Sequence, residues 1–169
     1  FEGREYKTNI IGNYNLANIH LALSMGKYFG IDTEQAIEAT SKYKPSSKRS
    51  EFLEKNGIKF VVDCYNANPS SMMLSLKSFL DSADKPRGVI LGDMLELGSY
   101  EEDEHKKIVE FIKGENLDRM VFIGPRFKKA LESTTFNYNW FLYSTEARDW
   151  FMSQDFRGHT FLLKGSRGI

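Results

Sequence analysis

The sequence predicts an α/β domain with a mainly parallel sheet, and two observations carry that prediction. From residue 50 onward, short apolar runs alternate with amphipathic segments of helical period. The apolar runs lack the regular polar alternation of a half-exposed strand, which is typical of parallel strands buried on both faces. Together these patterns favour a Rossmann-like fold of three layers, in which helices cover both faces of the sheet.

The first 45 residues predict a short extended start followed by two helices. Apolar residues recur at helical spacing at Leu16, Ile19, Leu23 and Met25. Gly30 fits the end of this helix, and Asp32 has the position of a cap for the next one. The run KYKPSSKR at 42–49 combines proline, serine and charge, so we expect a linker or hinge there.

The rest of the chain is predicted to form one hairpin and then alternating strands and helices. Asn56-Gly57 lies between two strand-like runs, and this dipeptide favours a tight hairpin turn. Later strands are expected at 87–93, 119–124, 140–143 and 160–164. One helix is expected to begin at Pro69, with Ser70 or Ser71 as its cap. Further helices are expected at 101–113, 125–131 and 145–154.

Composition excludes several classes of protein. Lys+Arg and Asp+Glu both number 23, so the formal net charge is zero, which argues against a nucleic-acid binder. No apolar run approaches the roughly 20 residues that span a bilayer, and FEGREYKTN lacks the parts of a signal peptide. Cys64 is the single cysteine, so an internal disulfide is excluded. We therefore expect a cytoplasmic protein without membrane insertion. Separately from these observations, we expect a monomer.

Three polar loops follow three of the predicted strands. They read DCYNANPSS at 63–71, GDMLELG at 92–98 and KGSRG at 164–168. Because ligands of open α/β sheets bind beyond the carboxyl ends of the strands, we expect the three loops to converge on one site.

The residue types in these loops allow several roles. Asp63 could accept hydrogen bonds from a ribose diol, and Asn66 and Asn68 could bind an amide or amino acid. Turn and capping roles remain open for all three, because Asp and Asn often satisfy loop backbone groups. Asp93 and Glu96 could hold a cation or an ammonium group, or simply face solvent.

The last loop indicates an anion site of another kind than a P-loop. Lys164 and Arg167 lie among glycines that allow close backbone approach. The phosphate-cradling pattern GxxxxGK[ST] is absent from these 169 residues. The three histidines lack metal-ligand spacing, so we expect no metal site, and His105 is expected at the surface. Cys64 is expected to be a small core residue rather than a nucleophile.

Four blocks together resemble one family. DCYNANPSSM, GDMLELG followed by His105, KGSRG and GNYNLANI at 12–19 occur in the order found in the Mur ligases. Within that family they are most similar to the members that add D-alanyl-D-alanine. Tyr14 is a departure, because the family usually has His at that position.

The resemblance implies an ATP-dependent ligase that joins UDP-MurNAc-tripeptide to D-Ala-D-Ala through an acyl phosphate. Residues 1–45 would be the end of the central ATP-binding domain, and 46–169 an incomplete C-terminal domain. ATP would contact Asn15, Asn18, Arg49 and Asp63. Substrate would contact Tyr65, Asn66, Asn68, Ser70, Asp93, Glu96, Lys164, Ser166 and Arg167. The ligands of Mg²⁺ would lie mostly outside this chain, which alone would be inactive.

Rival interpretations of two classes remain open on the sequence: another ligase of the superfamily, or a non-catalytic module. A folylpolyglutamate synthetase would have a D-G-A-H-N-P block where this chain has DCYNANP, and a sister ligase that adds diaminopimelate or lysine would carry a D-N-P-R signature. A non-catalytic nucleotide-binding Rossmann module is the rival from another class. It would leave the NANP and KGSRG blocks without a role.

Overall fold

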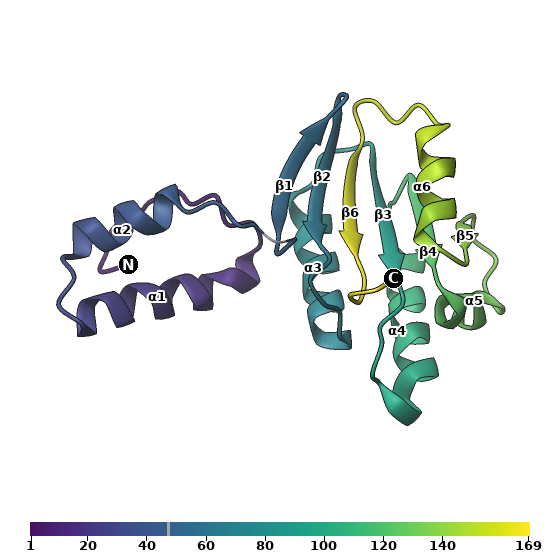
Figure 1. Ribbon diagram of the computed structural model, residues 1–169, viewed down its shortest axis with the longest axis horizontal. Helices are drawn as coiled ribbons and strands as arrows, with labels where there is room; N and C mark the ends of the chain where they lie inside the picture. Colours follow the sequence, from purple (N-terminus) through teal and green to yellow (C-terminus); the bar gives the residue numbers. More distant parts are fainter. Residues whose placement is uncertain (47) are drawn as a thin grey trace.

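The computed structural model describes residues 1–46 and 48–169, which form a helical part and an α/β part (Figure 1). The helical part contains η1 (Asn13–Asn15), α1 (Leu16–Tyr28) and α2 (Thr33–Lys42), and it projects beyond the edge strand of the sheet. The predicted linker 42–49 joins the two parts, and its Ser47 lies outside the described residues.

The two predicted helices are confirmed, with local caps that explain their ends. α1 ends at Tyr28, and Gly30 follows with φ +78, a conformation that glycine adopts at little cost. The Asp32 carboxylate accepts hydrogen bonds from the backbone N–H groups of Glu34 and Gln35 at the start of α2. The predicted extended start is wrong, because the residues before Asn13 form no strand.

The sheet has six strands in the order β1-β2-β6-β3-β4-β5. β1 (Glu51–Lys55) pairs antiparallel with β2 (Ile58–Asp63), and the other neighbours pair in parallel. These are β3 (Arg87–Gly92), β4 (Arg119–Ile123), β5 (Asn139–Phe141) and β6 (Thr160–Lys164). Asn56 and Gly57 form the hairpin turn with φ +55 and +75, as their sequence predicts.

β6 is the last strand of the chain, yet it lies in the middle of the sheet between β2 and β3. Its register pairs Asp63 with Lys164 on one side and Leu91 with Lys164 on the other. The three strands therefore end at the same level. The loops that follow them meet at one edge of the sheet, as the sequence predicts.

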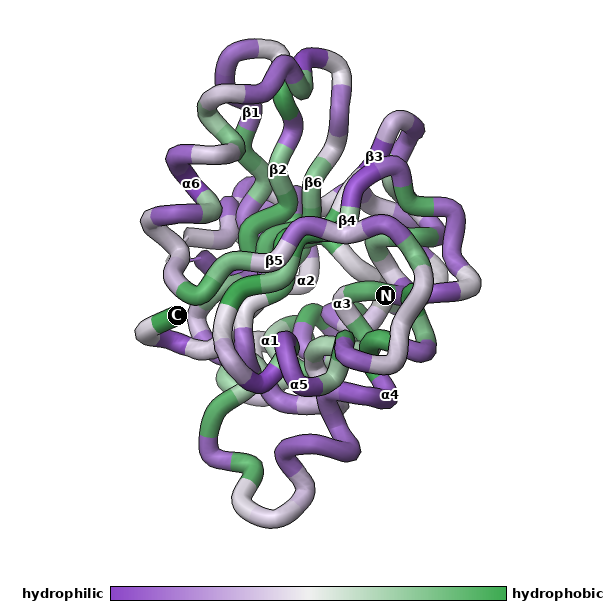
Figure 2. Tube along the Cα trace, turned by 90° about the vertical axis from the view of Figure 1, so that its right-hand side faces the viewer, coloured by the Kyte–Doolittle hydropathy of each residue, from purple (hydrophilic) through white to green (hydrophobic). Residues whose placement is uncertain are grey.

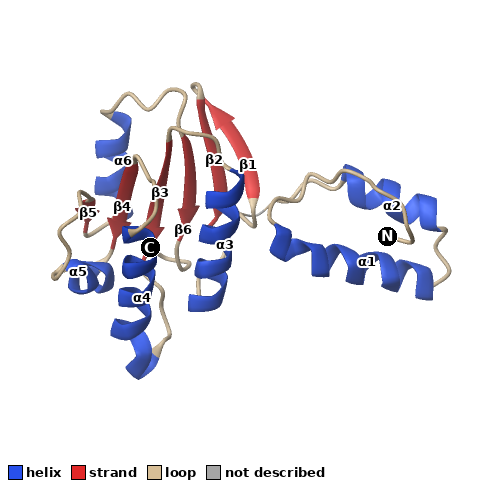
Figure 3. Cartoon of the chain, turned by 180° about the vertical axis from the view of Figure 1, so that it is seen from behind, coloured by secondary structure: helices blue, strands red, loops and turns tan. Residues whose placement is uncertain are grey.

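Helices cover both faces of the sheet, which confirms the three-layer prediction (Figures 1 and 3). One face carries α3 (Pro69–Ser82), α4 (Glu101–Lys113) and α5 (Pro125–Leu131), and the other carries α6 (Ser144–Met152); η2 (Gly98–Tyr100) precedes α4. The central strands consist mainly of apolar residues, and the outer loops are mainly hydrophilic (Figure 2). No helix in the described part of the chain is long and apolar enough to cross a membrane.

A hydrophobic core lies under α3, α4 and α5. Its fully buried side chains include Leu76, Leu91, Ile112, Phe122, Phe127 and Leu162. Burying each such side chain stabilises the fold by about 1.5–3 kcal/mol. This core fixes the strands whose carboxyl ends carry the polar loops.

Candidate functional site

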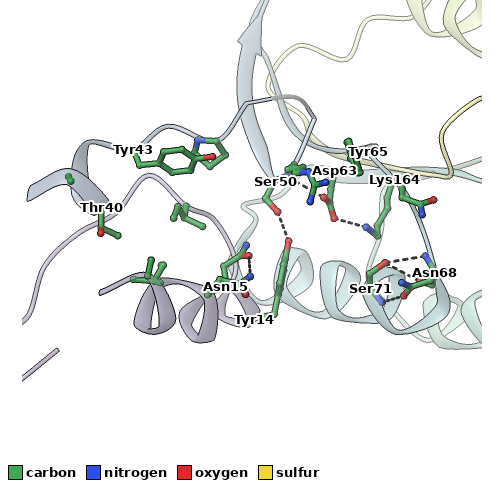
Figure 4. A pocket seen from close by; sticks show the side chains of 18 residues that line it. Tyr14, Asn15, Thr40, Tyr43, Ser50, Asp63, Tyr65, Asn68, Ser71 and Lys164 are labelled. Atoms are coloured by element: carbon green, nitrogen blue, oxygen red, sulfur yellow. Dashed lines mark hydrogen bonds and ion pairs between the residues drawn. The ribbon is translucent and has the colours of Figure 1, made fainter. Parts of the chain in front are cut away.

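A pocket of about 680 Å³ lies where the helical part meets the carboxyl edge of the sheet, and we call it the junction pocket. The predicted nucleotide contacts Asn15, Asn18, Arg49 and Asp63 all line it. The predicted substrate contacts Tyr65, Asn66, Asn68 and Lys164 line it as well. Figure 4 shows the labelled side chains converging from both parts of the chain.

A second, smaller pocket of about 330 Å³ adjoins the first, and we call it the edge pocket. Tyr65 and Asn66 line both pockets. The edge pocket is completed by Leu95, Glu96, Ser166 and Arg167. Three loops distant in sequence thus form one continuous polar surface, with a carboxylate from one loop and a guanidinium from another.

Asp63 and Lys164, which both line the junction pocket, form a largely buried ion pair. Lys164 Nζ lies 2.6 Å from Asp63 Oδ2, and the Lys164 side chain is 2% exposed. The same oxygen accepts a hydrogen bond from Ser75 Oγ, and Oδ1 accepts one from the Ser50 backbone N–H. Burial, together with the charge of Asp63, raises the pKa of the neighbouring Cys64 thiol, which disfavours the reactive thiolate.

Asn15 and Asn18 lie one turn apart at the start of α1. Asn15 Nδ2 donates to the Ile11 carbonyl, and its Oδ1 accepts from Asn18 Nδ2 at 3.2 Å. The residues are three positions apart, so a helical turn brings their amides to the same side. The pair presents amide groups to the junction pocket from the helical part.

Arg49 and Tyr65 also line this pocket and are stacked on each other. Arg49 Cζ lies 3.6 Å from the centroid of the Tyr65 ring, within the range of a cation–π contact. Both residues are exposed, so the guanidinium remains accessible from solvent. The linker arginine therefore faces the strand-end loop.

The asparagines of the NANP block have local roles in the structure. Asn68 is the N-cap of α3: its Oδ1 accepts from the Ser71 N–H at 2.8 Å, and Ser71 Oγ accepts from the Asn68 N–H. The prediction that Ser70 or Ser71 caps α3 is therefore wrong, although Ser71 completes the capping box. Asn66 Oδ1 accepts from the Ala67 N–H. Ser70 is exposed and lines neither pocket.

Ser166 fastens the three loops to one another. Its Oγ donates to the Ala67 carbonyl at 3.3 Å and accepts from the Leu95 N–H at 2.9 Å. Its own N–H donates to the Asp93 carbonyl. With 5% of its surface exposed, Ser166 shapes the edge pocket mainly by holding its walls together.

Asp93 does not face either pocket, so the structure corrects the prediction of a direct substrate contact. Its carboxylate is fully buried and accepts hydrogen bonds from the backbone N–H groups of Arg126 and Phe127 at the start of α5. A side chain at Gly124 would collide with this carboxylate, because an added Cβ would lie 2.4 Å from it. Asp93 therefore anchors α5 to the loop after β3.

His105 is also buried rather than exposed, which contradicts the sequence expectation. Its Nε2 accepts from the Met94 N–H at 3.0 Å, so the proton lies on Nδ1, which donates to the Glu101 carbonyl. Burial lowers the pKa of His105 below its usual value near 6.5. The neutral ring thus holds the GDMLELG loop against α4.

Three residues that complete the site were not predicted from the sequence. They are Ser50, Ser75 and Tyr14, and Tyr14 had been noted only as a departure from the family pattern. Ser75 lies on the face of α3 that turns toward Asp63, and its position twelve residues later gives no local signal. Ser50 is 6% exposed, and the hydroxyl that it contacts belongs to Tyr14, 36 residues away in sequence. Only the folded chain brings the Ser75 hydroxyl and the Ser50 N–H to the Asp63 carboxylate, and the Tyr14 hydroxyl to that of Ser50.

Comparison with known proteins identifies the family. Residues 48–167 match the family described as Mur ligase, glutamate ligase domain. The chain therefore belongs to the Mur ligase family.

Individual members of the family are also similar to the chain. The chain is 32% identical over 168 residues to the UDP-N-acetylmuramoyl-tripeptide–D-alanyl-D-alanine ligase of Bacillus subtilis (strain 168). The match covers 95% of this chain and 36% of that protein, so the chain spans about a third of its relative's length.

Solved structures share the fold. The UDP-N-acetylmuramoylalanyl-D-glutamyl-2,6-diaminopimelate–D-alanyl-D-alanyl ligase of Acinetobacter baumannii superimposes with a TM-score of 0.80 at 27% identity, over 92% of this chain and 34% of that one. The MurF ligase of Thermotoga maritima, solved in complex with ADP, gives 0.78 at 21% identity, over 94% and 36%.

Proposed function

We propose that the chain is part of an ATP-dependent ligase that adds D-Ala-D-Ala to UDP-MurNAc-tripeptide. The observation that carries the proposal is the junction pocket, which gathers amide, cationic and carboxylate side chains from both parts of the chain. The similarity to D-Ala-D-Ala-adding relatives along nearly the whole chain supports the choice of substrate.

The proposed roles follow from the chemistry of each group. Asn15 and Asn18 offer donors and acceptors for an adenine edge. Arg49 supplies a planar guanidinium for phosphate oxygens, once it leaves the Tyr65 ring. Asp63 accepts from the ribose through the oxygen that Lys164 does not occupy.

The edge pocket is proposed to receive the dipeptide. Arg167 offers a guanidinium for the terminal carboxylate, and Glu96 offers a carboxylate for the ammonium group before it loses its proton. Tyr65 and Asn66 lie between the two pockets and would line the path of the attacking amine toward the nucleotide. Asn68 and Ser166 hold the walls of this path, and Lys164 neutralises charge beside it.

The reaction needs little covalent chemistry from the protein. ATP supplies the phosphoryl group that turns the tripeptide carboxylate into an acyl phosphate, which is a far better electrophile. The amine of the dipeptide then attacks, and phosphate leaves. The residues named above orient the reactants and balance charge, which are the two contributions expected at such a site.

We propose that residues 1–45 end the central ATP-binding domain and that 46–169 form an incomplete C-terminal domain. Large apolar side chains of the helical part support the first assignment, because Leu16, Leu21, Met25 and Phe29 are all more than half exposed. An apolar hollow of about 440 Å³ on the α6 face of the sheet supports the assignment of an incomplete C-terminal domain, because both faces of a parallel sheet are normally covered.

The proposal places the Mg²⁺ ligands outside this chain. The junction pocket suits a nucleotide in its donors and acceptors, but Asp63, its one carboxylate among the described residues, is already paired with Lys164. The described residues contain no cluster of three metal-ligating side chains.

The test is phosphate release by the full-length protein with ATP, Mg²⁺, UDP-MurNAc-tripeptide and D-Ala-D-Ala, each omitted in turn. Release that requires both acceptor and tripeptide, with a product heavier by the dipeptide, supports the proposal. Release with glutamate or diaminopimelate in place of the dipeptide points to a sister ligase. No release under any combination points to a non-catalytic nucleotide-binding module.

A further inference from the structure

The corner that joins the linker to β1 has an unusual backbone. Lys48 and Ser50 have φ +60 and +49, and they flank Arg49. Residues other than glycine rarely adopt this left-handed conformation, and they keep it where surrounding contacts impose it. The contacts at this corner therefore determine where Arg49 points.

Besides a local hydrogen bond from the Lys48 N–H to Glu51 Oε2 at 3.3 Å, three contacts with residues more distant in the sequence hold the corner among the described residues. The Tyr65 N–H donates to the Lys48 carbonyl at 3.2 Å, and the Ser50 N–H donates to Asp63 Oδ1 at 3.3 Å. The third joins Tyr14 Oη and Ser50 Oγ at 2.7 Å, with either hydroxyl able to donate. Of these three, only the Tyr14 contact comes from the helical part, and Figure 4 shows the tyrosine rising from η1 toward Ser50.

The orientation of Tyr14 is itself constrained. Its ring lies against Gly12, where an added Cβ would approach the ring to 2.4 Å. Gly12 has φ +96, so both its conformation and its lack of a side chain leave room for the tyrosine. The hydroxyl therefore reaches Ser50 from a fixed direction.

We propose that Tyr14 is a positioning residue for the nucleotide. Through Ser50, its hydroxyl holds the left-handed corner, and this sets both Arg49 and the Asp63 carboxylate. The inference rests on the proposed function, because Arg49 and Asp63 are the groups assigned to phosphate and ribose. It adds a role for a residue that touches neither part of the nucleotide in that proposal.

Binding and kinetics of the full-length protein test it with three variants and a control. Tyr14→Phe removes one hydroxyl, and Ser50→Gly removes the other while keeping the N–H that reaches Asp63. The control Tyr28→Phe removes a phenolic hydroxyl from α1 at a residue that is 84% exposed.

We expect each of the first two variants to raise the Kd and KM for ATP by roughly threefold to tenfold, the usual worth of one hydrogen bond, with kcat at saturating ATP nearly unchanged. The double variant should be no worse than either single one, because both changes break the same contact. Tyr28→Phe should match the wild type. Additive effects, or a Tyr14→Phe protein that binds ATP as tightly as the wild type, would overturn the proposal.

Hydrogen exchange at the Ser50 amide separates this proposal from the proposed function. Faster exchange in Tyr14→Phe than in both wild type and Tyr28→Phe supports the role of the hydroxyl at the corner, even in a protein that binds no ATP. Unchanged exchange overturns that role whatever the nucleotide result.

Discussion

The ion pair between Asp63 and Lys164 joins the carboxyl ends of β2 and β6. Lys164 is almost fully buried, and its ammonium has the Asp63 carboxylate as its partner at 2.6 Å. A buried charge without a partner is far more costly than the pair itself is favourable. The two residues therefore act as a unit for stability, whatever each does for substrates.

We predict that Asp63→Asn lowers the free energy of unfolding by about 3 kcal/mol or more, because it strands the buried ammonium. Asp63→Asn combined with Lys164→Met should recover most of the loss. Urea unfolding of this chain measures both, with the exposed Asp81→Asn as control. Equal stability of Asp63→Asn and the control would contradict the assignment.

Individual residues were predicted unevenly, for physical reasons. The sequence indicated Asp63, Asn66 and Lys164 because polar residues follow apolar strands there. The prediction that Asp93 contacts substrate was wrong. A carboxylate after a strand can face a pocket or bind the N–H groups at the start of a helix, and only the fold brings the N–H groups of α5 to Asp93. Nothing in the sequence indicated Ser50, whose role depends on a left-handed backbone and a distant tyrosine.

The alternation of strands and helices could be predicted from the sequence, but the order of the strands in the sheet could not. Apolar runs predict strands locally, whereas the insertion of β6 between β2 and β3 depends on pairing across the whole chain. His105 was placed at the surface although a signal existed. Ile108, Val109 and Ile112 follow it at helical spacing, and this is the buried face of α4.

We predict that the buried His105 makes stability depend on pH. Its pKa is lower in the folded state than in the unfolded chain, so the unfolded chain binds more protons as the pH falls below about 7. The free energy of unfolding should fall through pH 6.5 and level off once the pH is below the folded-state pKa.

His105→Gln keeps an acceptor for the Met94 N–H and should flatten this dependence. The comparison is made by urea unfolding between pH 5 and 8, with the exposed His20→Gln as the matched control. A wild-type curve that is flat in this range, or a slope that persists in His105→Gln, would show that another group controls it.

For the molecule as a whole, the junction pocket lies between two parts joined by one linker. Its residues come from η1, α1 and α2 in the helical part, from the linker, and from the ends of β2 and β6, the loop after β2 and the start of α3. A site divided in this way can be assembled or opened by rotation about the linker, as in hinge closure. The sequence predicted the linker, but the pocket itself became visible only when both parts were placed.

We predict that this chain alone neither hydrolyses ATP nor forms the peptide bond. It lacks the GxxxxGK[ST] pattern that would hold the phosphates and Mg²⁺. A phosphate-release assay on the purified 169-residue chain should give the rate of a blank without protein. ATP-dependent turnover above that blank, abolished by Asp63→Asn, would mean that the chain carries a complete site.

The most direct measurement is the position of the nucleotide in a crystal structure of the full-length protein with ADP. We predict the adenine beside Asn15 and Asn18, the ribose within hydrogen-bond distance of Asp63, and Arg49 turned from Tyr65 toward the phosphates. A nucleotide bound away from the junction pocket, with Arg49 still on Tyr65 and Asp63 contacting only protein, would contradict it.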